Sequence, residues 1–154
     1  MNEMSHIDGE GRPSMVDVTR KENVRRFARA SGRIECAPET CRMIRENAAE
    51  KGNVLTVAEI AGIGAAKRTG ELIPLCHSLN ITHVKVRAEV EEKAVVVVSE
   101  VTSVGKTGVE MEALAAVSIA LLTVYDMCKA VDKTMRIQDI VLLEKRKEPR
   151  EREV

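Results

Sequence analysis

The sequence predicts an α+β domain in which helices cover one face of an antiparallel sheet. Two stretches, residues 28–36 and 84–90, alternate apolar and polar side chains, which indicates half-buried strands. Other stretches repeat apolar residues at helical spacing, and the last of them, about residues 109–133, is apolar all round in its middle. The predicted order of elements is therefore β-α-α-β-β-α-β, and 154 residues fit one domain.

The first half of the chain is predicted to hold one strand, two helices and a connection. Gly32 predicts a bulge in the first strand. A first helix is predicted over residues 38–51, between a proline at its start and a glycine after its end. Asn53 is a candidate cap for a second helix, which runs to about residue 65. Residues 72–77 contain a proline and predict an apolar connection that has to be buried.

The second half predicts a hairpin, the long helix and a last strand. Residues 91–93 form the polar turn of the hairpin, and the last strand spans residues 135–143. Both faces of the long helix should be covered, and another subunit is a candidate for one covering surface. If the two adjacent helices count as one, the order becomes the split βαββαβ arrangement of ferredoxin-like folds, an antiparallel sheet with helices on one face.

The ends of the chain are predicted to lie outside the folded domain. Residues 1–14 are polar, with two glycines and a proline, and predict a flexible N-terminal arm. Residues 146–154 are charged and predict a solvated C-terminal tail. A single domain is expected over residues 15–145.

Composition argues against a nucleic-acid partner. Lys and Arg total 24, Asp and Glu total 24, and the formal net charge is zero, so no overall positive field attracts a phosphate backbone. One Phe, one Tyr and no Trp leave almost nothing on which bases could stack. The core must therefore be aliphatic, and no nucleic-acid binding is expected.

Cysteine usage and hydropathy predict a cytoplasmic protein without a membrane segment. The four cysteines contain no C-x-x-C pair, and no secretory signal opens the sequence, so we expect reduced thiols. The cysteines and histidines do not cluster at zinc spacing, so no metal site is expected. The longest uncharged apolar run, residues 113–125, is 13 residues long. A membrane-spanning helix needs about 20 residues.

Polar residues that the core does not require stand at four places. At the first, Cys76 and His77 end the apolar connection, where the histidine could be a general base or a phosphate ligand, although a lone histidine is more often structural. At the second, residues 105–108 (GKTG) open the long helix. These residues are not a Walker A loop, because Glu100 stands where that motif requires glycine. They form a glycine turn before the start of a helix, which is either an anion-binding site or a plain turn.

The other two places lie on the long helix itself. Glu110 and Glu112 stand in its first turn, where carboxylates favour the helix dipole without any functional role. Asp126, Lys129 and Lys133 share one face and would form a solvated ion-pair stripe. Alternatively, because they border an apolar segment, they would have perturbed protonation and line a pocket.

Four strings carry a resemblance to one family: MVDV at residues 15–18, KRTGELIPLCH at 67–77, GKTGVEMEAL at 105–114 and LTVYDMCKA at 122–130. Together they resemble the cyclic pyranopterin monophosphate synthases, the accessory C protein of molybdenum cofactor biosynthesis. The resemblance covers about residues 6–145, which would make residues 15–145 a single catalytic domain.

The resemblance implies a homohexamer, a trimer of dimers of ferredoxin-like subunits with active sites at the dimer interface. The implied reaction is that of a phosphorus-oxygen lyase, which converts (8S)-3′,8-cyclo-7,8-dihydroguanosine 5′-triphosphate to cyclic pyranopterin monophosphate and pyrophosphate. By position, the implied catalytic residues are Lys51, His77, Glu112, Asp126, Lys129 and Lys145. The implied substrate-binding residues are Leu75, Cys76, His77, Glu110, Met111 and Glu112, to which the triphosphate adds Lys67 and Arg68 as cations.

The implied chemistry agrees with these residue types. Ring opening, ring closure and cyclic phosphate formation all move protons, and Asp126 and Lys129 are the main candidates for that transfer. Ammonium groups such as Lys51 and Lys145 would stabilise the leaving pyrophosphate. No tightly bound cofactor and no redox group are expected, and any Mg²⁺ would accompany the triphosphate.

The resemblance has one departure and one geometric consequence. The family usually ends with a Gly-Gly-Lys-Ser-Gly tail, whereas Lys145 is followed here by Arg-Lys-Glu-Pro, which makes the role of Lys145 less secure. Glu112 and Asp126 stand about 21 Å apart along one continuous helix. If both belong to the catalytic pocket, the simplest geometry packs the long helices of two chains antiparallel; the alternatives are a break in the helix or a structural role for one of the two residues.

Two other function classes remain to be weighed against an enzyme. A non-catalytic binding module on the same fold would be expected to carry apolar side chains at positions 77 and 126, whereas both are ionisable here. A nucleic-acid binder would need a basic face with aromatic residues.

Overall fold

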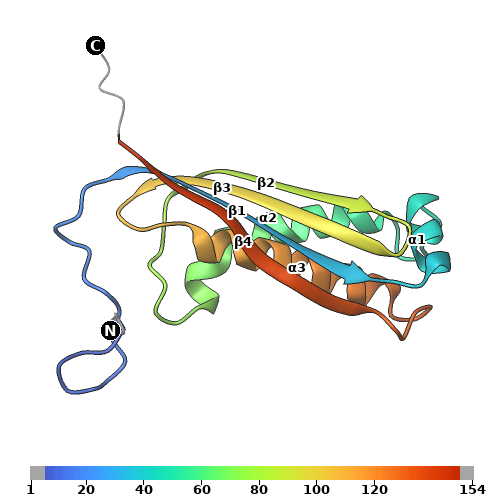
Figure 1. Ribbon diagram of the computed structural model, residues 1–154, viewed down its shortest axis with the longest axis horizontal. Helices are drawn as coiled ribbons and strands as arrows, with labels where there is room; N and C mark the ends of the chain where they lie inside the picture. Colours follow the sequence, from blue (N-terminus) through green and yellow to red (C-terminus); the bar gives the residue numbers. More distant parts are fainter. Residues whose placement is uncertain (1–5, 150–154) are drawn as a thin grey trace, which may run out of the picture.

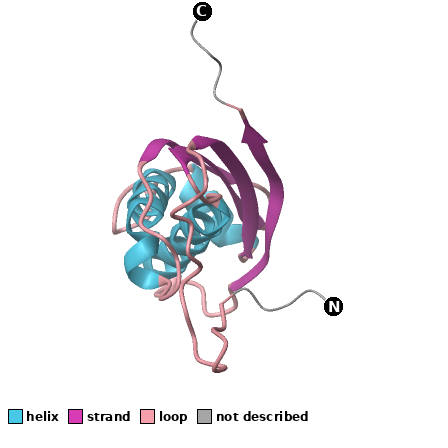
Figure 2. Ribbon diagram, turned by 90° about the vertical axis from the view of Figure 1, so that its left-hand side faces the viewer, coloured by secondary structure: helices cyan, strands magenta, loops and turns pink. Residues whose placement is uncertain are grey.

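The computed structural model describes residues 6–149 and shows a four-stranded sheet with three helices on one face (Figures 1 and 2). The elements in chain order are β1 (Val24–Glu35), α1 (Pro38–Arg45), α2 (Val54–Leu72), β2 (Ile81–Val90), β3 (Ala94–Gly105), α3 (Glu110–Cys128) and β4 (Arg136–Glu148). The strand order is β2-β3-β1-β4, and every neighbouring pair is antiparallel. The predicted α+β class and the ferredoxin-like order of elements are confirmed.

The core lies between α2, α3 and the inner face of the sheet, and it is aliphatic as predicted. Ala28, Ala30 and Ile34 of β1 are fully buried against the helices. Val97 and Val101 of β3 extend the same apolar layer. Small side chains on the inner face let α3 lie close to β1 and β3.

Gly32 lies where side chains of α3 pack tightly against β1. A Cβ at this position would lie 2.8 Å from Val117 Cγ1 and 2.9 Å from Leu121 Cδ1. An irregularity does fall at Gly32, as predicted: the pairing of β1 with β4 shifts register between Ser31 and Arg33. The extra residue there belongs to β4, where Asp139 has a φ of 55°, and the pairing of β1 with β3 runs without a shift.

We expect Gly32→Ala to lower the free energy of unfolding by about 1–2 kcal/mol, because the added methyl group overpacks the contact with α3. Gly64→Ala is the matched control, since a Cβ there would meet nothing within 4 Å and alanine favours a helix. Urea unfolding at one fixed protein concentration measures both. Equal stability of the Gly32→Ala variant and the parent would show that α3 moves away without cost.

Several predicted element boundaries differ from the structure. β1 begins at Val24 rather than residue 28, and α1 ends at Arg45 because Asn47 turns the backbone to a φ of 53°. α2 is capped by Asn53, as predicted, but continues to Leu72. The predicted connection, residues 72–77, is not buried in this chain: Leu72, the last residue of α2, is 58% exposed, and residues 73–77 are exposed or half-buried.

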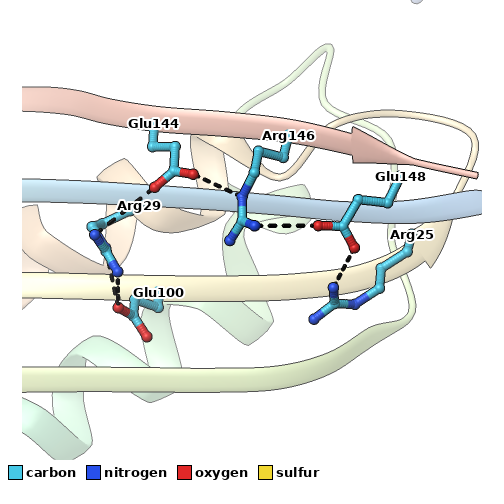
Figure 3. Close-up of polar contacts among 6 residues, drawn as sticks. All are labelled: Arg25, Arg29, Glu100, Glu144, Arg146 and Glu148. Carbon is cyan, nitrogen blue, oxygen red and sulfur yellow. Dashed lines mark hydrogen bonds and ion pairs between the residues drawn. The ribbon is translucent and has the colours of Figure 1, made fainter.

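The predicted C-terminal tail is partly a strand. β4 continues to Glu148, and Arg146 pairs with Glu144 at 2.7 Å and with Glu148 at 3.3 Å. Figure 3 shows these side chains on the outer face of the sheet with Arg29, which pairs with Glu100 at 2.7 Å. Residues 146–148 therefore belong to the sheet, and residues 150–154 lie outside the described part of the chain.

α3 is a core helix. By length and composition alone it could cross a membrane, a test that the core helices of soluble proteins also pass. Ala116, Val117 and Leu121 are fully buried between α2 and the sheet, which accounts for the apolar composition. The opposite face is not covered within one chain, since Leu122 is 52% exposed and Tyr125 37% exposed.

The start of α1 depends on a residue that is distant in the sequence. Its N-cap, Ala37, has no side chain that could accept a hydrogen bond. Asp132, in the loop before β4, accepts hydrogen bonds from the Ala37 amide at 2.8 Å and the Thr40 hydroxyl at 3.0 Å. Its other oxygen accepts from the Thr134 amide at 2.8 Å and the Thr134 hydroxyl at 2.7 Å. This buried carboxylate joins α1 to the loop that leads into β4.

Candidate active site

The first turn of α3 brings two predicted carboxylates to one end of the molecule, where α2 also ends (Figure 1). Val109 caps α3 without a side-chain hydrogen bond, so the first amides of the helix lack helical acceptors. The carboxylate of Glu110 lies against Gly108, in the space that a Cβ there would take. The GKTG turn therefore leaves room for Glu110 beside the helix start.

A cavity of about 300 Å³ joins this turn to the connection after α2. Its lining includes the predicted Leu75, Cys76, His77 and Glu110, together with Lys21. The Nε2 atom of His77 donates a hydrogen bond to the Val16 carbonyl at 2.7 Å. In the neutral ring, Nδ1 is then the nitrogen that can accept a proton.

Burial changes the protonation of two groups beside this cavity. Glu112 is only 3% exposed, and this burial raises the pKa of its carboxyl. The negative charge of the nearby Glu110 raises the same pKa further. Burial also raises the pKa of the Cys76 thiol, and the carboxylates of Glu112 and Glu110 raise it further. Cys76 therefore remains a thiol at neutral pH and is suited to contact a ligand rather than to attack it.

A second cavity, of about 310 Å³, is also lined by Glu110. It is lined by Arg26, Phe27, Gly108, Glu110, Lys145, Arg146 and Lys147. Lys145 Nζ lies 3.3 Å from Glu110 Oε1, so this predicted cation is held at the helix start. The two cavities share Gly108 and Glu110 and are therefore adjacent.

Of the two predicted cations on α2, the structure brings one to the site. Lys67 and Glu112 line a third cavity, of about 190 Å³, together with Gly70 and Ser78. Arg68 is exposed and lines none of these three cavities. Met111 is 37% exposed, so it is open to contact from outside the chain.

The remaining predicted residues meet at the opposite end of α3. Lys129 Nζ lies 2.7 Å from Asp126 Oδ1, and Lys51 Nζ lies 3.4 Å from Asp126 Oδ2. Hydrogen bonds from Lys129 and Lys51 lower the pKa of Asp126, and the bond to Asp126 raises the pKa of Lys129. All three side chains are more than half exposed, and none lines the cavities beside Glu110.

Comparison with known proteins identifies the family. The MoaC family profile matches residues 15–148, which include every predicted site residue. This chain belongs to the MoaC family. Cyclic pyranopterin monophosphate synthase 1 of Mycobacterium tuberculosis (strain H37Rv) is 54% identical over 143 residues, 92% of this chain and 84% of that protein. The cyclic pyranopterin monophosphate synthase of Desulfitobacterium hafniense is 52% identical over 93% of this chain and 88% of that protein. The enzyme of the same name from Chloroflexus aurantiacus is 53% identical over 94% of this chain and 90% of that protein.

In this MoaC family member, the site residues of the chain form two separate groups. His77, Glu110, Glu112 and Lys145 lie around the start of α3, whereas Asp126 lies near the end of the same helix. Glu112 and Asp126 are about 21 Å apart along the axis. The predicted pocket around Asp126 is not formed by one chain, where its carboxylate is 59% exposed and paired with two lysines.

Four cations of the MoaC chain beside these cavities were missed from sequence. The cavities that contain Glu110 are also lined by Lys21, Arg26, Arg146 and Lys147. Arg26 could have been found from the sequence: extending the alternation of β1 two residues before Ala28 places Arg26 on the same face as the apolar side chains. No local pattern marks Lys21, because its segment is held by contacts far along the chain, such as Lys106 Nζ to the Thr19 carbonyl at 2.8 Å.

The cysteines of the MoaC chain do not form a reactive group. All four are free, and burial raises the pKa of Cys36 to about 12. Among residues 6–149, no three His, Cys, Asp or Glu side chains are grouped so that they could hold a metal ion.

Proposed function

We propose that this chain is a cyclic pyranopterin monophosphate synthase, which converts 3′,8-cyclo-7,8-dihydro-GTP to cyclic pyranopterin monophosphate and pyrophosphate. The observation that carries the proposal is the similarity to proteins of that name, 52–54% identical over more than nine-tenths of this chain. The polar groups at both ends of α3 supply the acids, bases and cations that this lyase reaction requires.

The residues at the start of α3 have complementary roles in this proposal. Glu112, with a raised pKa, is the candidate proton donor, and Nδ1 of His77 is the candidate acceptor. Lys145 and Lys67 provide positive charge beside Glu110 and Glu112, where the triphosphate of the substrate would be stabilised. Leu75, Cys76 and Met111 are the candidate contacts for the ring system.

Asp126, Lys129 and Lys51 complete the site from a second subunit. A small substrate cannot span the 21 Å or so between Glu112 and Asp126 of one chain. An antiparallel contact between the α3 helices of two chains would bring the two groups together and cover exposed side chains such as Leu122 and Tyr125. The homohexamer, a trimer of dimers with interfacial sites, is our proposal for the assembly.

The proposal extends to cofactor and compartment. No cofactor is bound tightly, and Mg²⁺, if used, arrives with the triphosphate, since its phosphate oxygens are the ligands that Mg²⁺ prefers. We place the protein in the cytoplasm. The partner is a small molecule rather than a nucleic acid or a membrane.

The test is incubation of the purified protein with enzymatically prepared 3′,8-cyclo-7,8-dihydro-GTP. We expect a cyclic pterin phosphate, identified by mass after oxidation to its fluorescent form, and one pyrophosphate per turnover, without a redox cofactor. GTP itself is the control and should release none. Intact substrate and no pyrophosphate would overturn the proposal.

The two cations of α2 should differ in their effect on substrate binding. We expect Lys67→Ala to raise KM about tenfold with little change in kcat, because Lys67 lines the cavity of Glu112 and its positive charge would attract the triphosphate. We expect Arg68→Ala to change KM by only about twofold, since an exposed charge outside the cavity contributes little. Steady-state kinetics on both variants measure the difference. Equal increases would mean that the cavity of Glu112 is not the place where Lys67 acts.

A further inference from the structure

The end of β4 brings Lys145 to the start of α3, but the inner face of the sheet does little to hold it there. β4 is an edge strand and is paired with β1 alone. Leu142, opposite Ala30, is the last apolar residue of β4 that stands opposite an inward residue of β1, and the inward residues after it are Lys145 and Lys147. Lys147 stands opposite Arg26, and like charges in opposed positions destabilise a sheet.

The outer face of the same stretch shows three attractive pairs across the two strands. The directly opposed residues are Arg29 with Glu144, Phe27 with Arg146 and Arg25 with Glu148. Arg25 forms an ion pair with Glu148 (Figure 3). The Arg146 guanidinium lies 4.4 Å from the centre of the Phe27 ring, within the range of a cation–π contact. We call these six residues the clasp.

Contacts along β4 join the three pairs into one network. Arg146 lies between two carboxylates, 2.7 Å from that of Glu144 and 3.3 Å from that of Glu148. The Arg29 guanidinium lies 3.8 Å from the Glu144 carboxylate on the neighbouring strand. An isolated exposed ion pair contributes little to stability, whereas a network of several charges can contribute measurably. The clasp is such a network.

The clasp determines where Lys145 points. Successive residues of a strand point to opposite faces, and Lys145 stands between Glu144 and Arg146. With these two side chains held on the outer face, Lys145 is directed inward, where its Nζ lies 3.3 Å from Glu110. Fraying of the end of β4 would move this ammonium group away from the start of α3.

We propose that the clasp positions Lys145 for the reaction and that Arg25 and Glu148 are positioning residues. Neither residue lines the two cavities that contain Glu110. They act on catalysis only by keeping the end of β4 paired with β1. The role of Lys145 in the reaction, and therefore the catalytic part of this inference, rests on the proposed function.

The clasp uses the stretch in which this chain departs from the usual sequence of its family. Arg146 follows Lys145 directly, where the family usually has glycine. Glycine has no side chain to stack on Phe27 or to join Glu144 to Glu148. This way of holding Lys145 is therefore expected only in chains that carry the same charges.

The first measurement is hydrogen exchange at the amides of residues 144–148 that are paired with β1, in the purified full chain. We expect Glu148→Gln, which removes a carboxylate shared by two arginines, to speed this exchange about fivefold. Arg33→Gln is the matched control, because Arg33 pairs with Glu91 at 3.6 Å on the same face of β1, at the other end of the strand. It should leave this exchange unchanged. Equal exchange in Glu148→Gln and the parent would overturn the clasp.

The second measurement separates positioning from a general loss of structure. We expect Glu148→Gln to lower kcat/KM for the cyclised substrate about fivefold in the parent but by less than about 1.5-fold in a Lys145→Gln background, because it acts through that lysine. Adding Arg25→Gln to Glu148→Gln should cause no further loss, since the two residues form one pair. Arg33→Gln should change kcat/KM by less than about 1.5-fold. If Lys145→Gln has no measurable turnover, the affinity for inorganic pyrophosphate replaces kcat/KM in the same comparison.

The outcomes distinguish this inference from the proposed function. Equal losses from Glu148→Gln with and without Lys145, in an enzyme that turns over substrate, would overturn the positioning role alone, because misfolding or a direct contact with substrate has that effect. A chain that does not turn over the cyclised substrate would overturn the proposed function and the catalytic part of this inference. Faster exchange in Glu148→Gln would, even then, confirm the clasp as the contact that holds Lys145.

Discussion

Mixing two inactive variants, Glu112→Ala and Asp126→Ala, should restore activity. Each variant alone is expected to lose activity about a hundredfold or more, because each removes a group that moves protons. If every site takes Glu112 from one subunit and Asp126 from its partner, a mixed dimer contains one intact site and one doubly altered site. Equal mixing should then return about a quarter of the parent activity.

A second pair of variants is the control for this experiment. Asp126 and Lys129 lie 2.7 Å apart at one end of α3, so they enter the same site from the same subunit. Mixing Asp126→Ala with Lys129→Ala should therefore leave every site with one lesion and restore nothing. Co-expression with two different affinity tags isolates the mixed oligomers. If the first mixture also stays inactive, the site is not shared in this way.

The strands and helices were predictable where the pattern is local. Alternation within β2 and the turn after it marks the hairpin, and Asn53 marks the start of α2 through a hydrogen bond from the Thr56 amide at 2.9 Å. The end of β4 was not predictable, because Lys147 and Glu148 look like a solvated tail until they pair with β1. That pairing joins residues more than 100 positions apart, and no local propensity signals it.

The candidate site was predictable as a set of residues but not as an arrangement. The i, i+3 spacing of Asp126 and Lys129 indicates their ion pair, which the structure contains. The shared cavity of His77 and Glu110 depends on how the connection after α2 meets the start of α3, which only the packing decides. Arg26 was missed because Phe27 breaks the alternation of β1: its ring lies outward, 4.4 Å from the Arg146 guanidinium.

Replacing Asp132 should destabilise the fold more than any substitution considered above. Its carboxylate is 4% exposed and accepts four hydrogen bonds, two at the start of α1 and two from Thr134. Asp132→Asn would turn one acceptor oxygen into a donor that faces other donors. We expect the free energy of unfolding to fall by about 3 kcal/mol, since bonds to a charged group contribute about 1.5–3 kcal/mol each and are not additive.

The pH dependence of this loss distinguishes a charge effect from a packing effect. Burial alone would raise the pKa of Asp132, but the hydrogen bonds from Ala37, Thr134 and Thr40 outweigh it and hold the pKa below the ordinary value of 3.8. A carboxyl whose pKa is lower in the folded state stabilises the protein fully above its unfolded pKa, and this stability is lost as pH falls through the folded pKa. The parent and Asp132→Asn should therefore differ by a constant amount between about pH 5 and 8 and converge below about pH 4. Urea unfolding at equal protein concentration measures this, with Asp139→Asn as control, because Asp139 is exposed and its φ of 55° also suits asparagine. A difference that persists at low pH would mean that the shape of the side chain, rather than its charge, holds α1 to the loop before β4.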